Sequence, residues 1–224
     1  MLMHPNPFAT RFTAPGRVPY LAAAGLCARL HAEWLQQGRV GAILGPHGCG
    51  KSTLLATLEQ AWSREHGYRV RHVAMHDGQR TLPPEFWRPD YCTHDLLVID
   101  GYEQLGWRAR WALQRLWRRT SCGLLVTAHV AIRLPTLYRV EPDYSTFLTL
   151  VRQLLEPLHD SPRAEAFLAR QAETAWATTR GNAREALFRL YDRWEEVSAD
   201  DVNSSGCNDP RDASGWAARC VSSN

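Results

Sequence analysis

The stretch of sequence that decides the fold is Gly45-Pro46-His47-Gly48-Cys49-Gly50-Lys51-Ser52. It matches the pattern G-x-x-x-x-G-K-[ST], follows the apolar run Val40–Leu44, and precedes the helix-forming run Thr53–Leu58. A strand, a glycine-rich loop and a helix in this order form the context in which the pattern binds phosphate. Glycines let several backbone N–H groups point at one phosphate, and the N-terminus of the helix adds partial positive charge.

The end of this loop predicts the chemistry of its ligand. The Lys51 ammonium group is expected to reach the β- and γ-phosphates of a nucleotide, and the Ser52 hydroxyl to ligate Mg²⁺, a hard cation that prefers oxygen. The sequence therefore predicts ATP and Mg²⁺ as cofactors, although the loop alone does not separate ATP from GTP. The expected nucleotide-binding set is Gly45, Pro46, His47, Gly48, Cys49, Gly50, Lys51, Ser52 and Thr53.

Bulk properties are those of a globular chain, with 224 residues, 45% hydrophobic and 22% charged, enough for one α/β domain and a small appendage. The net charge of +3 points to no particular partner. The six cysteines form no C-x-x-C pair, so neither a zinc site nor a redox motif is predicted. The start lacks signal-peptide features, and no run of about 18 apolar residues predicts a membrane span. We expect a cytoplasmic protein.

Apolar strands alternate with helices between residues 39 and 142. The pattern predicts strands at 39–44, 68–75, 95–100, 123–128 and 135–140, helices at 51–65 and 103–119, and a proline-rich loop at 77–94. Continuous apolar strands of this kind belong to a parallel sheet that is covered on both faces. The predicted fold class is therefore α/β, a three-layer sandwich around a mainly parallel five-stranded sheet, with ligands at the carboxyl ends of the strands.

The segments outside this core have a different character. Residues 1–38 read as an extended lead-in followed by a helix at 21–37, and residues 39–142 form the core. Residues 143–197 carry helical patterns at 143–156, 163–177 and 182–197, which predict a small helical lid subdomain. From residue 198 the chain becomes polar and small, so residues 198–224 are expected to be a disordered tail.

The apolar run Leu96–Ile99 ends in Asp100, whose carboxylate is expected to hold Mg²⁺ through water beside Ser52. Hydrolysis also needs a group that polarises water. Glu103, three residues later, is the first candidate, and Asp77 at the end of the preceding strand is the second. An acidic residue that merely favours the start of a helix is the alternative interpretation of Glu103.

Two further segments place polar groups near the expected phosphates. The run Leu124–His129 ends a strand, so Thr127 or His129 can bind the γ-phosphate or the attacking water, unless His129 is an ordinary surface histidine. Asn182 can cap the last helix, with Glu185 three residues later. Arg184 then projects from the first turn and can close over a γ-phosphate, or is simply an exposed arginine.

The helix expected at 103–119 combines aromatic and basic residues. Trp107 and Trp111 are spaced i, i+4 and are expected to pack on the sheet or on a neighbour. The arginines either form a solvated face or track the phosphates of a nucleic acid. They are Arg108, Arg110, Arg115, Arg118 and Arg119.

Together, four motifs resemble the additional-strand division of P-loop NTPases, and within it the AAA+ ATPases and their STAND relatives. The motifs are Gly45–Ser52, Leu96–Asp100, Leu124–His129 and Gly181–Leu187, and the resemblance covers roughly residues 39–197. Gly181-Asn182-Ala183-Arg184 is similar to the sensor-2 motif, Thr127 falls where sensor 1 would lie, and Asn6-Pro7-Phe8 is similar to a lead-in that contacts adenine. The resemblance implies ATP, Mg²⁺, a strand inserted between the phosphate-loop strand and the Asp100 strand, and often nucleotide-dependent assembly.

One departure from the family pattern leaves three functions open. Many such ATPases place a glutamate directly after the aspartate, where this chain has Gly101. The first hypothesis is a switch ATPase that uses Glu103, and the second is a P-loop kinase that binds a small-molecule acceptor at Asp77 and residues 78–94. The third is a non-hydrolysing, nucleotide-gated interaction module that touches DNA through the 108–119 arginines. A transporter-type ATPase is disfavoured because no Leu-Ser-Gly-Gly-Gln signature occurs.

Overall fold

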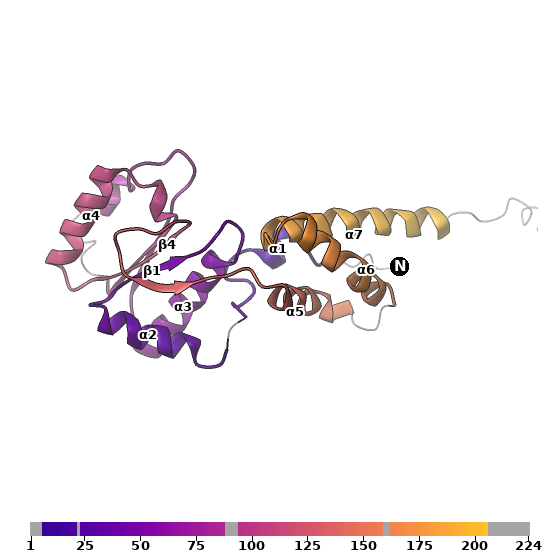
Figure 1. Cartoon of the computed structure of the whole chain (residues 1–224), viewed down its shortest axis with the longest axis horizontal. Helices are drawn as coiled ribbons and strands as arrows, with labels where there is room; N and C mark the ends of the chain where they lie inside the picture. The colour runs from indigo at the N-terminus through magenta and orange to yellow at the C-terminus, as the bar shows by residue number, and fades with distance from the viewer. Residues whose placement is uncertain (1–5, 22, 88–93, 159–161, 206–224) are drawn as a thin grey trace, which may run out of the picture.

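The computed structural model describes residues 6–21, 23–87, 94–158 and 162–205. An α/β core occupies one end of the molecule and a group of helices the other, so the described chain is elongated (Figure 1). The core contains a five-stranded sheet with helices on both faces. The second part consists of α5 (Tyr144–Leu155), α6 (Pro162–Thr178) and α7 (Ala183–Ser205).

The sheet is parallel, and its strands lie in the order β2-β3-β4-β1-β5. The strands are β1 (Val40–Leu44), β2 (Val70–Ala74), β3 (Leu96–Asp100), β4 (Gly123–Ala128) and β5 (Thr136–Arg139). β4 lies between β1, which leads into the phosphate loop, and β3, which ends in Asp100. The inserted strand that the family resemblance implies is therefore confirmed.

Alternation along the strands divides the core into two layers. In β3, Leu96 and Val98 face α2 (Leu26–Gln36) and α3 (Lys51–His66), whereas Leu97 and Ile99 face α4 (Trp107–Arg119). Successive strand side chains point to opposite faces, so a strand of five apolar residues contributes to both layers. The predicted three-layer α/β sandwich is confirmed.

The helices α5 to α7 have a core of their own, into which the N-terminal segment packs. The Phe8 ring is buried, stacked on Phe167 with 5.6 Å between ring centroids and edge-on to Trp194 at 6.1 Å. Asn6 Nδ2 donates to the Tyr191 carbonyl oxygen at 3.0 Å and to a Glu195 carboxylate oxygen at 2.7 Å. Aromatic rings of α6 and α7 thus enclose the Phe8 ring, and the adenine contact implied for Asn6–Phe8 stays a prediction.

Helix boundaries differ from the sequence-based expectations where glycines or short turns intervene. The lead-in contains a short helix, α1 (Thr10–Thr13), and α2 begins at Leu26 because Gly25 adopts a left-handed conformation with φ of 79°. The segment expected as one helix at 103–119 divides into a 3₁₀ turn, η3 (Tyr102–Gln104), and α4. α2 and α4 thus start later than the apolar pattern indicates.

Two expectations about exposed and terminal residues were wrong. Trp107 and Trp111 do not pack on the sheet, because Ala109 and Leu113 form the buried side of α4. α7 continues to Ser205, past the start of the tail expected at residue 198, since no glycine or proline occurs before Gly206 and each added residue gains a hydrogen bond. Residues 206–224 lie outside the described part. Among the described helices, none is long and apolar enough to cross a membrane.

Candidate nucleotide-binding site

The phosphate loop connects β1 to the first turn of α3 at the carboxyl edge of the sheet. Gly48 and Gly50 have φ of 69° and 97°, a left-handed region that residues with a Cβ rarely adopt. Gly50 precedes Lys51, the first residue of α3. The glycines of the motif therefore occupy positions where the backbone requires them, and they aim the start of α3 at the loop.

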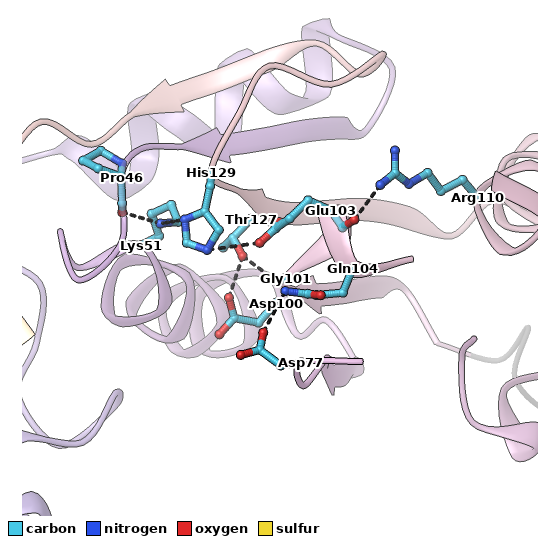
Figure 2. A network of polar contacts seen from close by, with 10 residues as sticks. All are labelled: Pro46, Lys51, Asp77, Asp100, Gly101, Glu103, Gln104, Arg110, Thr127 and His129. Carbon is cyan, nitrogen blue, oxygen red and sulfur yellow. Dashed lines mark hydrogen bonds and ion pairs between the residues drawn. The ribbon is translucent and has the colours of Figure 1, made fainter. Parts of the chain in front are cut away.

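Lys51 is the buried cation of this loop. Its Nζ donates to the Pro46 carbonyl oxygen at 2.6 Å and to His129 Nδ1 at 2.9 Å (Figure 2). Burial lowers the pKa of Lys51, and the negative charges of Glu103 and Asp100 act in the opposite direction. The predicted phosphate-binding lysine thus lies among the other predicted site residues and not on an isolated turn.

His129 links Lys51 to Glu103. Its Nε2 lies 3.1 Å from Glu103 Oε1, and its ring stacks on His47 with 3.4 Å between centroids. Burial, followed by the charge of Lys51, lowers the pKa of His129, so the imidazole is neutral near pH 7. A neutral imidazole that accepts a hydrogen bond from Lys51 at Nδ1 carries its proton at Nε2. The Nε2–H group then donates a hydrogen bond to the Glu103 carboxylate.

Glu103 presents one carboxylate oxygen without a partner. Oε2 is buried and accepts no hydrogen bond from any described residue, whereas Oε1 contacts His129. The main-chain oxygen of Glu103 accepts a hydrogen bond from Arg110 at 2.6 Å (Figure 2). A buried acceptor without a donor is unfavourable, and a water molecule can supply the missing hydrogen bond.

Asp100 and Thr127 meet at the ends of adjacent strands. Thr127 Oγ1 donates to Asp100 Oδ1 at 2.5 Å and accepts from the Gly101 N–H at 2.9 Å. Asp100 and Ser52 both line one open cavity. A carboxylate and a hydroxyl that face the same space are the oxygen donors that Mg²⁺ prefers, so these residues fit the predicted metal.

Asp77, the second candidate base, lies outside this buried network. It accepts a hydrogen bond from Gln104 Nε2 at 3.1 Å, and that contact is exposed (Figure 2). Gln104 and Arg110 were not predicted to adjoin the site. No local sequence signal identifies Gln104, while Arg110 follows Glu103 by seven residues, a spacing that two helical turns would place on one face.

Helix α7 begins against the phosphate loop. Asn182 Oδ1 accepts from the Glu185 N–H at 3.2 Å, which confirms the predicted cap. The same side chain lies directly over Gly48, where a Cβ atom would overlap Asn182 Oδ1. Arg184 is exposed, and its charge lowers the pKa of Lys51. The residues predicted for the lid therefore adjoin the loop.

Comparisons with known proteins agree with this arrangement. No family model matches the chain. A DNA replication initiation factor aligns over 84% of this chain and 63% of its own, with a TM-score of 0.55 and 17% identity. Domain III of the Thermotoga maritima replication initiation protein DnaA aligns over 86% of this chain and 90% of its own, with a TM-score of 0.53 and 17% identity. The chain has the AAA+ fold.

Two more similarities complete the comparison. Cdc6p from Pyrobaculum aerophilum shares the AAA+ fold over 88% of this chain and 67% of its own, with a TM-score of 0.55 and 14% identity. The phosphate import ATP-binding protein PstB of Tropheryma whipplei is 44% identical over 45 residues, which are 20% of this chain and 18% of that protein. The chain thus spans less than two thirds of both this relative and the initiation factor.

Proposed function

We propose that this chain is a Mg²⁺-dependent, ATP-hydrolysing switch. The observation that carries the proposal is the contact series Lys51–His129–Glu103, which connects the phosphate-binding lysine to a buried carboxylate with one free oxygen. A carboxylate of this kind suits a general base, because its open acceptor is close to the place where the γ-phosphate is expected. Asp77 has no comparable environment.

Each residue then has a defined role. The loop N–H groups and Lys51 bind the phosphates, which requires Lys51 Nζ to leave Pro46 and His129. Glu103 accepts a proton from water while the water oxygen attacks the γ-phosphorus, and the bond to the β–γ bridging oxygen breaks to leave ADP. His129 holds the Glu103 carboxylate through Nε2–H, and Thr127 fixes Asp100. Gly101 does not remove the base in this scheme, because Glu103 supplies it.

The metal site would be formed by Ser52 and by Asp100, acting directly or through water. Mg²⁺ at such a site offsets the negative charge that develops on the phosphate oxygens. The residues of this chain contribute the oxygen donors, and the Thr127 hydroxyl orients the Asp100 carboxylate by binding one of its two oxygens.

The lid supplies the switching element. Asn182 contacts the loop at Gly48, and Arg184 extends from the first turn of α7 on the same side as Lys51. An arginine guanidinium forms strong, directed hydrogen bonds with phosphate oxygens, so a γ-phosphate gives Arg184 a partner that ADP lacks. We infer that ATP and ADP therefore favour different positions of α7 relative to the core.

Phosphate release from ATP by the purified protein tests this function. The matched variants are Glu103→Gln and Asp77→Asn, which each replace a carboxylate by its isosteric amide. We expect Glu103→Gln to lower the turnover number by a factor of about 10² or more, the usual contribution of a general base, while Asp77→Asn retains activity. Loss of turnover in Asp77→Asn with normal turnover in Glu103→Gln would reverse the assignment.

An acceptor kinase is the second candidate, and one cavity favours it. The space that Ser52 and Asp100 line extends along α3 and β2 to Glu59 and His72 and measures about 890 Å³. Ligand pockets of roughly 300–1,000 Å³ hold small molecules. Free phosphate released without any acceptor supports the ATPase, whereas turnover that appears only when a small-molecule acceptor is added supports the kinase. ATP binding with no turnover at all supports the non-hydrolysing module.

A further inference from the structure

The outward face of α4 consists of tryptophan and arginine. With about 100° between successive residues, six exposed side chains occupy an arc of about 120° around the helix. In angular order they are Trp107, Arg118, Trp111, Arg115, Arg108 and Arg119. The opposite side of the helix packs on the sheet through Ala109 and Leu113. We call these six residues the α4 face.

Both indole rings of this face are open to solvent. Trp107 is 74% exposed and Trp111 is 60% exposed, although tryptophan is usually largely buried. The Arg108 guanidinium lies 5.2 Å from the Trp107 ring centroid, and that of Arg115 lies 5.6 Å from the Trp111 centroid. Since no contact with the described chain covers most of either ring, folding of the core does not account for two tryptophans at these positions.

The charge of the helix indicates what the face fits. α4 contains five arginines and no acidic residue, and Arg80 adjoins its start, where the Gly106 N–H donates to the Arg80 carbonyl oxygen at 2.9 Å. A complementary partner carries repeated negative charge beside flat apolar groups. Nucleic acid has both properties, and a single strand exposes its base faces, which a duplex keeps stacked.

We propose that the α4 face binds single-stranded nucleic acid. Trp107 and Trp111 are four residues apart, so about 6 Å of helix axis separates them and each ring can stack on a different base. Arg108, Arg115 and Arg119 form a row beside the two rings, where they can contact the phosphates. α4 lies at the end of the molecule away from α5–α7, so this contact is compatible with any position of the lid (Figure 1).

Fluorescence anisotropy with labelled 20-nucleotide strands of DNA and RNA, and with a duplex, tests the proposal without any added nucleotide. We expect the single strands to bind more tightly than the duplex. Comparing the affinities for single-stranded DNA and RNA shows which of the two the face prefers. Trp107→Ala combined with Trp111→Ala should weaken binding at least about 30-fold, because each stacked base contributes about 1–3 kcal/mol. The corresponding double Trp→Phe variant should regain most of the affinity, since phenylalanine still stacks.

Salt dependence separates the two kinds of side chain. Arg108→Ala combined with Arg115→Ala should reduce the slope of log affinity against log salt by about 1.4, the value for two phosphate contacts on a single strand. The double Trp→Ala variant should keep the wild-type slope. Control variants remove similar groups elsewhere: Phe12→Ala, whose exposed ring lies under Arg11, and the pair Arg29→Ala and Arg193→Ala. These should bind like wild type.

Three results would overturn the proposal. The first is that no strand binds, and the second is that strands bind equally well to wild type and to the double Trp→Ala variant, with circular dichroism showing that both are folded. The third is tighter binding of duplex than of single strands. Sedimentation analysis completes the test. If the protein binds no oligonucleotide but self-associates, and the Trp→Ala substitutions abolish that self-association, the α4 face is an interface between copies of the chain.

Discussion

His129 is the residue on which the proposed chemistry depends most closely. It contacts Lys51 through Nδ1 and Glu103 through Nε2, so it holds the carboxylate in place and also competes with phosphate for the lysine. Both effects arise from one neutral ring, because the two nitrogens have opposite hydrogen-bonding roles. Removing the ring should therefore act differently on turnover and on ATP affinity.

We predict that His129→Ala lowers the turnover number for ATP about tenfold or more, because Glu103 loses the group that orients it. ATP affinity should be unchanged or higher, since Lys51 no longer has to leave the imidazole. Steady-state phosphate release and equilibrium nucleotide binding measure the two quantities. His66→Ala, which removes a histidine stacked on His31 away from the loop, is the control. Weaker ATP binding with normal turnover in His129→Ala would contradict this role.

At the scale of single residues, the sequence identifies those whose roles follow from the residues adjacent to them in the sequence. Lys51 and Ser52 follow from a continuous motif, and Asp100 from the strand that it ends. The His129–Glu103 contact could not be foreseen, because it requires β4 to lie beside β3 and a 3₁₀ turn to bring Glu103 back over the strand ends. The buried, unpartnered Oε2 of Glu103 depends on the same three-dimensional arrangement.

One element contact makes stability depend on pH, the ion pair between β2 and α3. His72 Nδ1 lies 2.8 Å from Glu59 Oε2, and the hydrogen bond to Glu59 raises the pKa of His72. A histidine whose pKa is raised by folding stabilises the fold fully below its unfolded pKa of about 6.5. That contribution is lost as the pH rises through the pKa of the folded protein.

We predict that Glu59→Gln destabilises the protein more at pH 5.5 than at pH 8.5. The difference should be about 1 kcal/mol or less, because the pair is partly exposed and solvent screens it. Urea unfolding at the two pH values gives the free energies of unfolding. The control is Glu33→Gln, which breaks the exposed Arg29–Glu33 pair on α2. Because that pair contains no histidine, Glu33→Gln should change the free energy of unfolding equally at both pH values. An equal loss at both pH values for Glu59→Gln would show that His72 is not charged in the folded protein.

The strands and helices could be predicted wherever the apolar residues of a segment followed a single periodicity. β1, β3 and β4 follow from short apolar runs, β2 follows from a half-alternating segment, and the α3 and α5 ranges follow from helical periodicity. α4 shows the limit, because the tryptophans at i, i+4 indicate one buried side while Ala109 and Leu113 indicate the other. In the structure Ala109 and Leu113 belong to the buried core below the helix, so tertiary packing decides which side of α4 is buried. Apolar character alone gave the wrong side for Trp107 and Trp111.

At the scale of the whole molecule, the core and the lid meet at Gly48 and Asn182. A Cβ on Gly48 would overlap Asn182 Oδ1, so the contact depends on a glycine that the phosphate loop needs for its own conformation. No pattern in the sequence indicates this contact, because the two residues are far apart in the chain. It joins phosphate binding to the position of α7.

We predict that Gly48→Ala displaces the start of α7, seen as faster amide hydrogen exchange at residues 183–187. Gly67→Ala is the matched control, since Gly67 has the same φ of 69° but no atom within 4 Å of its Cβ position. Both substitutions should lower the free energy of unfolding by about 1–2 kcal/mol through backbone strain, and only Gly48→Ala should loosen α7. Similar exchange at residues 183–187 in the two variants would show that the lid does not rest on the loop.

The central claim, that the phosphate loop binds ATP for hydrolysis, is tested most directly by calorimetric titration of ATP with Mg²⁺ into wild type and Lys51→Ala. Arg29→Ala, which removes one exposed positive charge from α2 and lines no part of the cavity beside Ser52 and Asp100, is the control. We predict that Lys51→Ala weakens ATP binding about 100-fold or more and abolishes turnover, because charge-assisted hydrogen bonds to phosphate contribute about 1.5–3 kcal/mol each. Arg29→Ala should bind like wild type. Wild-type affinity and full turnover in Lys51→Ala would contradict the account.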